Sequence, residues 1–191
     1  MFTRTIRPAV SLLLVMTVLT GLAYPLLITG IARVAFPRQA AGSLVIQHGK
    51  AVGSSLIGQS FSDPKYFWSR PSATTPQPYN GTASTGSNLG PLNPALIDGV
   101  KAQVKALHDA DPTNTQPIPV ELVTASASGL DPEISPAAAR YQLSRVARAR
   151  GIPAGRVEAL IASHVQGRLL GLFGEARINV LELNLALDGL H

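Results

Sequence analysis

The chain has 191 residues, of which 46% are hydrophobic and 14% charged, whereas an ordinary soluble domain has about 25% charged residues. This composition excludes a disordered charged tail and indicates that part of the chain lies outside water. The absence of cysteine excludes a disulfide framework, a thiolate zinc site and a cysteine nucleophile. From residue 34 onward, 13 basic residues balance 11 acidic ones, which argues against a nucleic-acid-binding surface.

The first predicted element is an apolar segment, residues 8–35, which follows a short tail of residues 1–7. As one helix its uncharged part, residues 8–32, would be about 37 Å long, enough to cross a bilayer. Pro25 should kink this helix, and Gly21 and Gly30 offer small surfaces against which another helix could pack. A cleaved signal peptide is the alternative, although its apolar stretch would be shorter, about 7–15 residues.

The orientation of the span depends on the positive-inside rule. Arg4 and Arg7 precede the span, and Arg33 and Arg38 follow it, so the side chains alone give a tie. The terminal amine and the short tail favour a cytoplasmic N-terminus. We therefore expect residues 36–191 to form an extracytoplasmic domain.

That domain should begin with a β-hairpin, because two β-favouring runs, residues 43–47 and 51–57, flank His48-Gly49-Lys50. An aromatic knot of Tyr66, Phe67 and Trp68 follows. Such a knot is more often part of a core than a platform for carbohydrate or peptide, since buried aromatic rings supply much apolar area.

Residues 69–93 are rich in Pro, Gly, Asn, Ser and Thr, and Arg70 is their only charged residue. This composition suits a flexible linker. The apolar residues Tyr79 and Leu89 instead favour an ordered loop, and long loops inside compact domains tend to be functional.

The next helix should start at Asn93-Pro94, where Asn caps the helix and Pro takes its first position, and end at Asp111-Pro112. Residues 119–124 are predicted to form a strand, and residues 126–131 a turn around Gly129. The α-helical and β-strand segments together predict an α+β fold.

A second helix should run from its cap, Ser135, to Arg150, with Gly151 as its stop signal. Arg145, Arg148 and Arg150 crowd its end. Cations there complement the negative end of the helix dipole, which is the interpretation we favour. A surface for an anionic partner is the alternative.

A third helix should follow Pro153 and reach His164. Residues 179–190 are ambiguous, because their leucines alternate as in a strand. Asn179 followed by Glu182 resembles a capping box, and the composition favours helix, so we expect helix there.

The sequence holds no recognisable catalytic or metal-binding constellation. Its four histidines lie far apart, and it has neither a nucleophile elbow nor a phosphate-binding Walker loop. Nothing here predicts a stand-alone enzyme. A membrane-anchored extracytoplasmic ligand-binding module or hydrolase that works alone is nevertheless the alternative to a subunit.

A family resemblance is carried by motifs that occur in one order along nearly the whole chain. They are Gly53-Ser-Ser-Leu-Ile-Gly-Gln59, Tyr66-Phe-Trp-Ser-Arg-Pro-Ser-Ala73, Gly86-Ser-Asn-Leu-Gly-Pro91, Thr124-Ala-Ser-Ala-Ser-Gly-Leu-Asp-Pro132, Ile134-Ser-Pro136 and Asn179-Val-Leu-Glu-Leu-Asn184. With these motifs and the single N-terminal span, the sequence resembles the C subunit of the potassium-transporting Kdp ATPase, the KdpC family. Ser69 departs from the pattern, which has Gly there.

The resemblance implies a non-catalytic subunit of an ATP-driven, high-affinity potassium import complex in the bacterial inner membrane. Its partners would be a channel-like potassium-translocating subunit (KdpA), a P-type ATPase subunit (KdpB), a small single-span subunit (KdpF) and membrane lipid. Such a subunit is needed for assembly and acts as a catalytic chaperone that raises the affinity of the ATPase subunit for ATP. No cofactor would be bound tightly.

In the family a glutamine matching Gln142 is tied to the role in ATP binding. The predicted orientation would place Gln142 across the membrane from cytoplasmic ATP. We therefore expect this amide to serve structure, by packing or hydrogen-bonding within its own helix. For docking to partners we select Tyr66, Phe67, Trp68, Arg70, Tyr79, Asn88 and Asn93.

Overall fold

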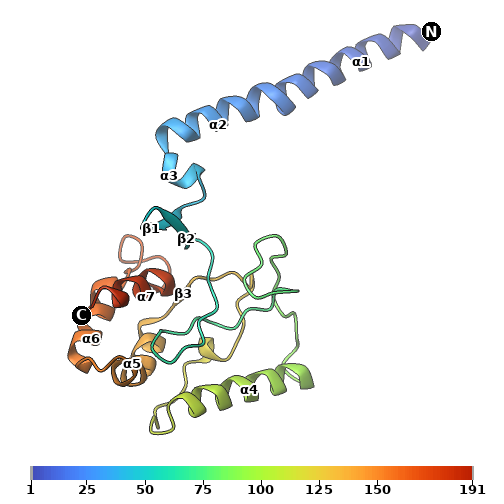
Figure 1. The fold of residues 1–191 in the computed structure, drawn as a ribbon. Coiled ribbons are helices and arrows are strands. Elements are labelled where there is room, and N and C mark those ends of the chain that lie inside the picture. Colours follow the sequence, from blue (N-terminus) through green and yellow to red (C-terminus); the bar gives the residue numbers. More distant parts are fainter. Residues whose placement is uncertain (1, 191) are drawn as a thin grey trace. The chain divides into compact units, whose positions relative to one another are not determined.

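A computed structural model describes residues 2–190, which divide into two units, Met1–Leu44 and Val45–His191 (Figure 1). The first unit is helical. It consists of α1 (Phe2–Val18), the π-helical turn η1 (Leu19–Ala23), α2 (Tyr24–Ala35) and the short α3 (Pro37–Ala40). The stretch Arg4–Ala35, with a mean hydropathy of 2.1, is long and apolar enough to cross a membrane, and none of it is buried within the chain.

Just before Pro25, where the sequence predicts a kink, the helix forms the wide turn η1. Proline has no N–H to donate and its ring collides with the carbonyl group four residues earlier, that of Gly21. The backbone N–H of Tyr24 reaches back to the carbonyl oxygen of Leu19, which is the longer bond of a π-helix. Space is open around Gly21 and Gly30, where no atom lies within 4 Å of an added Cβ.

The second unit begins with the predicted hairpin, β1 (Leu44–Gln47) and β2 (Lys50–Ser54). His48 and Gly49 between the strands have positive φ angles of 50° and 76°, as a two-residue hairpin turn requires. A second small sheet pairs β3 (Glu133–Ile134) with β4 (Ile178–Asn179) in antiparallel fashion.

Four helices complete this unit: α4 (Pro94–Ala110), α5 (Pro136–Arg150), α6 (Ala154–His164) and α7 (Val180–Asp188). The predicted caps are confirmed. The side chains of Asn93, Ser135 and Asn179 accept hydrogen bonds from the backbone at the start of α4, α5 and α7. Gly151 ends α5 in the left-handed conformation, with φ 66°.

The core lies among α5, α6 and α7, with α5 packed on α6 and α6 on α7. Fully buried side chains come from all three helices, for example Val146, Ile161 and Leu183, and from Ile178 on β4. Phe67 joins them with no exposed surface. The alternative that the sequence favoured for the aromatic knot is thus confirmed for Phe67.

The strand predicted at residues 119–124 is wrong, because the chain forms there the 3₁₀ turn η2 (Val120–Leu122). Pro119 lacks the N–H that a strand needs for pairing. The turn closes on itself instead, since the Thr124 hydroxyl donates to the Val120 carbonyl oxygen at 2.8 Å. Leu122 enters the core from this turn.

Candidate functional site

The segment Phe67–Trp68 is held by two side-chain amides that grip its backbone. The Trp68 N–H donates to Oε1 of Gln142 at 2.7 Å, and Nε2 of Gln142 donates to the Trp68 carbonyl oxygen at 3.1 Å. One residue earlier, Asn184 makes the same pair of bonds to Phe67, at 2.8 and 2.9 Å. We call these two paired contacts the amide clamps. They join the aromatic segment to α5 and to α7.

Both clamp amides are buried, with 1% of Gln142 and 2% of Asn184 exposed. The four bonds use the donor and the acceptor of each side-chain amide, and Gln142 Nε2 also reaches the Ala138 carbonyl oxygen at 3.3 Å. A buried amide is satisfied in this way when it serves the fold. The contacts of Gln142 agree with a structural task, but only some of them lie within its own helix: the bond to Ala138 does, and the shorter bonds to Trp68 do not.

Arg145 extends the Gln142 clamp. Its Nη2 donates to Oε1 of Gln142 at 2.6 Å, and its Nη1 donates to the carbonyl oxygens of Pro64 and Tyr66. The guanidinium lies over the Trp68 ring, 4.5 Å from the centroid. Burial lowers the pKa of Arg145 to about 10, so the group stays charged at neutral pH and its bonds here are charge-assisted.

The other two arginines at the end of α5 also have partners within the chain. Arg148 pairs with the buried carboxylate of Asp111. Arg150 pairs with Asp188 at 2.6 Å and lies 4.9 Å over the Tyr66 ring. These contacts add to the favourable position of the cations at the helix C-terminus.

Residues 69–93 form an ordered loop, as favoured from the sequence. The Ser72 hydroxyl donates to the Gly129 carbonyl oxygen at 2.7 Å, and the Thr85 N–H donates to the Ser128 carbonyl oxygen at 3.0 Å. The Tyr79 hydroxyl donates to the Arg70 carbonyl oxygen. Burial raises the pKa of Tyr79 to about 12. The loop is thus tied to the turn at residues 126–131.

Of the predicted docking residues, the structure brings Tyr66, Phe67 and Trp68 together at the clamps and Arg70 and Tyr79 in the loop. Asn88 and Asn93 are exposed further along the loop, Asn93 as the cap of α4. Phe67 is interior, so its ring has no surface to offer to a partner.

Asn184 was not among the site residues predicted from the sequence, although it lies within the family motif at residues 179–184. An Asn between the leucines of a buried helix was the signal that could have found it, because a buried amide needs partners.

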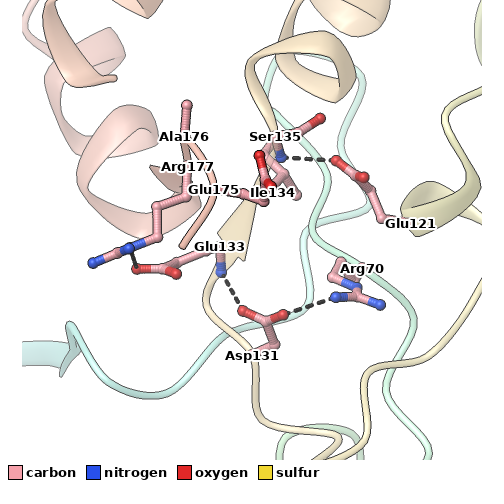
Figure 2. A pocket seen from close by; sticks show the side chains of 9 residues that line it. All are labelled: Arg70, Glu121, Asp131, Glu133, Ile134, Ser135, Glu175, Ala176 and Arg177. Carbon is pink, nitrogen blue, oxygen red and sulfur yellow. Dashed lines mark hydrogen bonds and ion pairs between the residues drawn. The ribbon is translucent and has the colours of Figure 1, made fainter. Parts of the chain in front are cut away.

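A surface pocket of about 360 Å³ lies beside β3 (Figure 2). Four carboxylates line it, and all are engaged: Asp131 by Arg70 and Glu133 by Arg177, both at 2.9 Å, Glu175 by Arg168 at 2.9 Å, and Glu121 by the backbone N–H of Ser135 at 2.7 Å. Arg70 ties the start of the loop at residues 69–93 to Asp131, Arg177 is tied to Glu133 on β3, and the cap of α5 is tied to Glu121. Among residues 2–190 no group of three or more His, Cys, Asp or Glu side chains is placed to hold a metal ion.

The chain thus combines one apolar helix that is long enough to span a membrane with a domain whose buried amides bind its own aromatic segment.

Comparison with known proteins identifies the family. The family model described as "KdpC: K+-transporting ATPase, c chain" matches residues 6–189. A "Potassium-transporting ATPase KdpC subunit" from Variovorax paradoxus (strain S110) is 67% identical over 183 residues, covering 96% of this chain and 95% of the relative. Proteins of the same name from Sorangium cellulosum (strain So ce56) and Dechloromonas aromatica (strain RCB) are 64% and 62% identical, each across 96% of this chain and 97% and 96% of the relative. The chain belongs to the KdpC family.

Proposed function

We propose that the chain is a non-catalytic subunit of an ATP-driven, high-affinity potassium import complex and that its N-terminal helix anchors it in the bacterial inner membrane. The names of its relatives support potassium transport by an ATPase. The N-terminus lies in the cytoplasm and residues 36–191 lie outside, as the sequence favours. Protease added to intact spheroplasts should cut within residues 36–191, whereas protection of that region would contradict this orientation.

The partners are the channel-like potassium-translocating subunit (KdpA), the P-type ATPase subunit (KdpB) and the small single-span subunit (KdpF). In the membrane, the open surface at Gly21 and Gly30 lets a partner helix approach closely. Gly21 lies within the wide turn η1, and Gly30 lies in α2. We infer that the anchor packs on the channel-like subunit at these small residues.

Outside the membrane, the ordered loop and the part-exposed rings of Tyr66, Trp68 and Tyr79 form the docking surface. Beside Asn93, the side chain of Leu92 is 89% exposed. Arg70 is held by Asp131, so its contribution is to fix the loop.

Buried polar groups, above all Gln142, hold the docking surface in shape. This observation carries the proposal. Gln142 has 1% of its surface exposed and is occupied by Trp68 and Arg145. It acts on the ATP affinity of the ATPase subunit indirectly, by keeping the aromatic segment in position for the complex. Such an effect is a coupling between distant sites, and ATP itself needs no contact with this chain.

Expression of the complex with and without this chain tests the proposal. Without the chain, the remaining subunits should co-purify in lower yield, and the surviving ATPase should need more ATP for half-maximal activity. If the other subunits assemble and bind ATP equally well without it, the chain is not their assembly subunit. Purification of the chain alone would then favour a stand-alone ligand-binding module or hydrolase.

A further inference from the structure

Between α6 and β4 the chain forms a protruding hairpin, residues 166–177, which we call the apolar hairpin (Figure 1). Two isolated bridges hold its arms together, Gln166 with Arg177 and Leu169 with Phe173. Its tip, residues 169–173, carries four large apolar side chains. They are all exposed: Leu169, Leu170, Leu172 and Phe173.

The turn at the tip holds a leucine in a strained backbone conformation. Leu170 and Gly171 have positive φ angles of 53° and 75°, and the Leu172 N–H donates to the Leu169 carbonyl oxygen at 3.1 Å. Asn, Asp or Gly is favoured at such a φ, and a leucine is strained there. Leu170 is 82% exposed, so no contact within the domain offsets this strain.

Four of the five backbone N–H groups of the tip are paired within the hairpin. The N–H groups of Leu169, Gly171, Leu172 and Phe173 all donate to carbonyl oxygens within the hairpin, at 2.8 to 3.1 Å. A segment that enters lipid has to satisfy its backbone internally. The tip holds no charged side chain, and the charges begin at its base, where Arg168 pairs with Glu175 at 2.9 Å.

The base of the apolar hairpin also lies where the domain is tethered. Asn179 on β4 donates to the Ser55 carbonyl oxygen at 2.8 Å, beside the end of β2. The hairpin therefore emerges next to the first strands of the domain. The eight residues 36–43 connect those strands to the apolar helix, and eight residues reach at most about 28 Å.

We propose that the tip of the apolar hairpin inserts its leucines and Phe173 into the surface of the bilayer that holds the chain's own anchor. The ligand is lipid, at the boundary between headgroups and acyl chains. The inference rests on the proposed membrane anchoring. It adds a second, reversible point of attachment, which limits the rotation of the domain about its tether.

Because the chain has no cysteine, single-cysteine variants allow a clean test. The full chain is reconstituted in phospholipid vesicles with an environment-sensitive fluorophore at Leu172→Cys. Lipids brominated near the headgroup should quench this label about twofold or more. The matched label at Lys101→Cys, on the exposed face of α4, should stay unquenched. A label at Leu13→Cys reports the anchor separately, and its failure to be quenched by lipids brominated deep in the acyl chains would contradict the anchoring itself.

A second variant separates lipid contact from folding. Leu170→Asn places a favoured residue in the turn, so the melting temperature of the domain should stay equal or rise. Quenching at Leu172→Cys should nevertheless fall by at least about half, since one of the inserted side chains is lost. Equal fluorescence at Leu172→Cys and Lys101→Cys in vesicles would overturn the proposal. Shielding of the tip only after the other subunits are added would also overturn it, and would assign the tip to a protein partner.

Discussion

Replacing Gln142 by Met and, in a separate variant, Asn184 by Leu removes the amide clamps one at a time with little change in side-chain volume. Each change deletes two hydrogen bonds to the backbone of the aromatic segment. A hydrogen bond contributes about 1 kcal/mol net, and a buried group left without a partner costs about 1–3 kcal/mol. Each variant should therefore lose about 2–4 kcal/mol of stability, with Gln142→Met at the upper end because Arg145 also loses an acceptor.

This loss is smaller than the total stability of most domains, about 5–15 kcal/mol, so both variants should still fold. The assay is ATP-dependent activity of the purified complex as a function of ATP concentration, together with thermal unfolding of the chain. If the clamps act by shaping the docking surface, both variants should raise the ATP concentration for half-maximal activity.

A difference between the two variants in their effect on ATP affinity would refute this reasoning. If Gln142→Met weakens ATP affinity while Asn184→Leu leaves it unchanged at a similar loss of stability, the amide of Gln142 acts on nucleotide beyond its structural task. Gln142→Asn offers a further comparison, because the shorter side chain keeps the amide but cannot reach both Trp68 atoms without movement.

Three further predictions concern the domain itself. Gly58→Ala should destabilise it by about 1–3 kcal/mol in chemical denaturation, because the added Cβ would lie 2.7 Å from the Asp131 carbonyl oxygen; an unchanged midpoint would contradict this close packing. Since the pKa of Tyr79 is raised from 10.0 to about 12, the stability that its neutral phenol contributes is fully present below pH 10 and is lost as the pH rises through about 12. In Tyr79→Phe the free energy of unfolding should therefore depend less on pH between about pH 10 and pH 12. An equal slope in the variant and the original chain would refute the raised pKa of Tyr79. Gly151→Ala should lower the free energy of unfolding by about 1 kcal/mol, because the backbone there has φ 66°. Gly155→Ala, in open space within α6, should raise it by about 0.4–1 kcal/mol. Equal effects of the two variants would contradict the left-handed cap at Gly151.

Local signals were enough to predict the helices. The caps Asn93, Ser135 and Asn179 and the stop at Gly151 depend on neighbours within four residues, so a sequence pattern can carry them. The prediction of a strand at residues 119–124 was wrong because β propensity does not say whether a partner strand is present. The chain closes that stretch with local bonds and Pro119 instead.

The site depends on contacts that no local pattern carries. Gln142 and Trp68 lie 74 positions apart, and Asn184 and Phe67 lie 117 positions apart. Sequence reasoning reached the aromatic segment and Gln142 separately, by composition and by family resemblance, but not their pairing. The engagement of Arg148 by Asp111 is likewise a property of the folded chain.

The central claim is that this chain stays in the membrane and works as part of a larger assembly. Its most direct test is affinity purification of the full chain, tagged at its C-terminus, from mildly solubilised bacterial membranes, followed by mass spectrometry of every component. We predict recovery of the uncleaved chain, 20.0 kDa plus the tag, together with the P-type ATPase subunit and the channel-like subunit. A shorter soluble form without the N-terminal helix, or a full-length chain that elutes alone, would contradict the account.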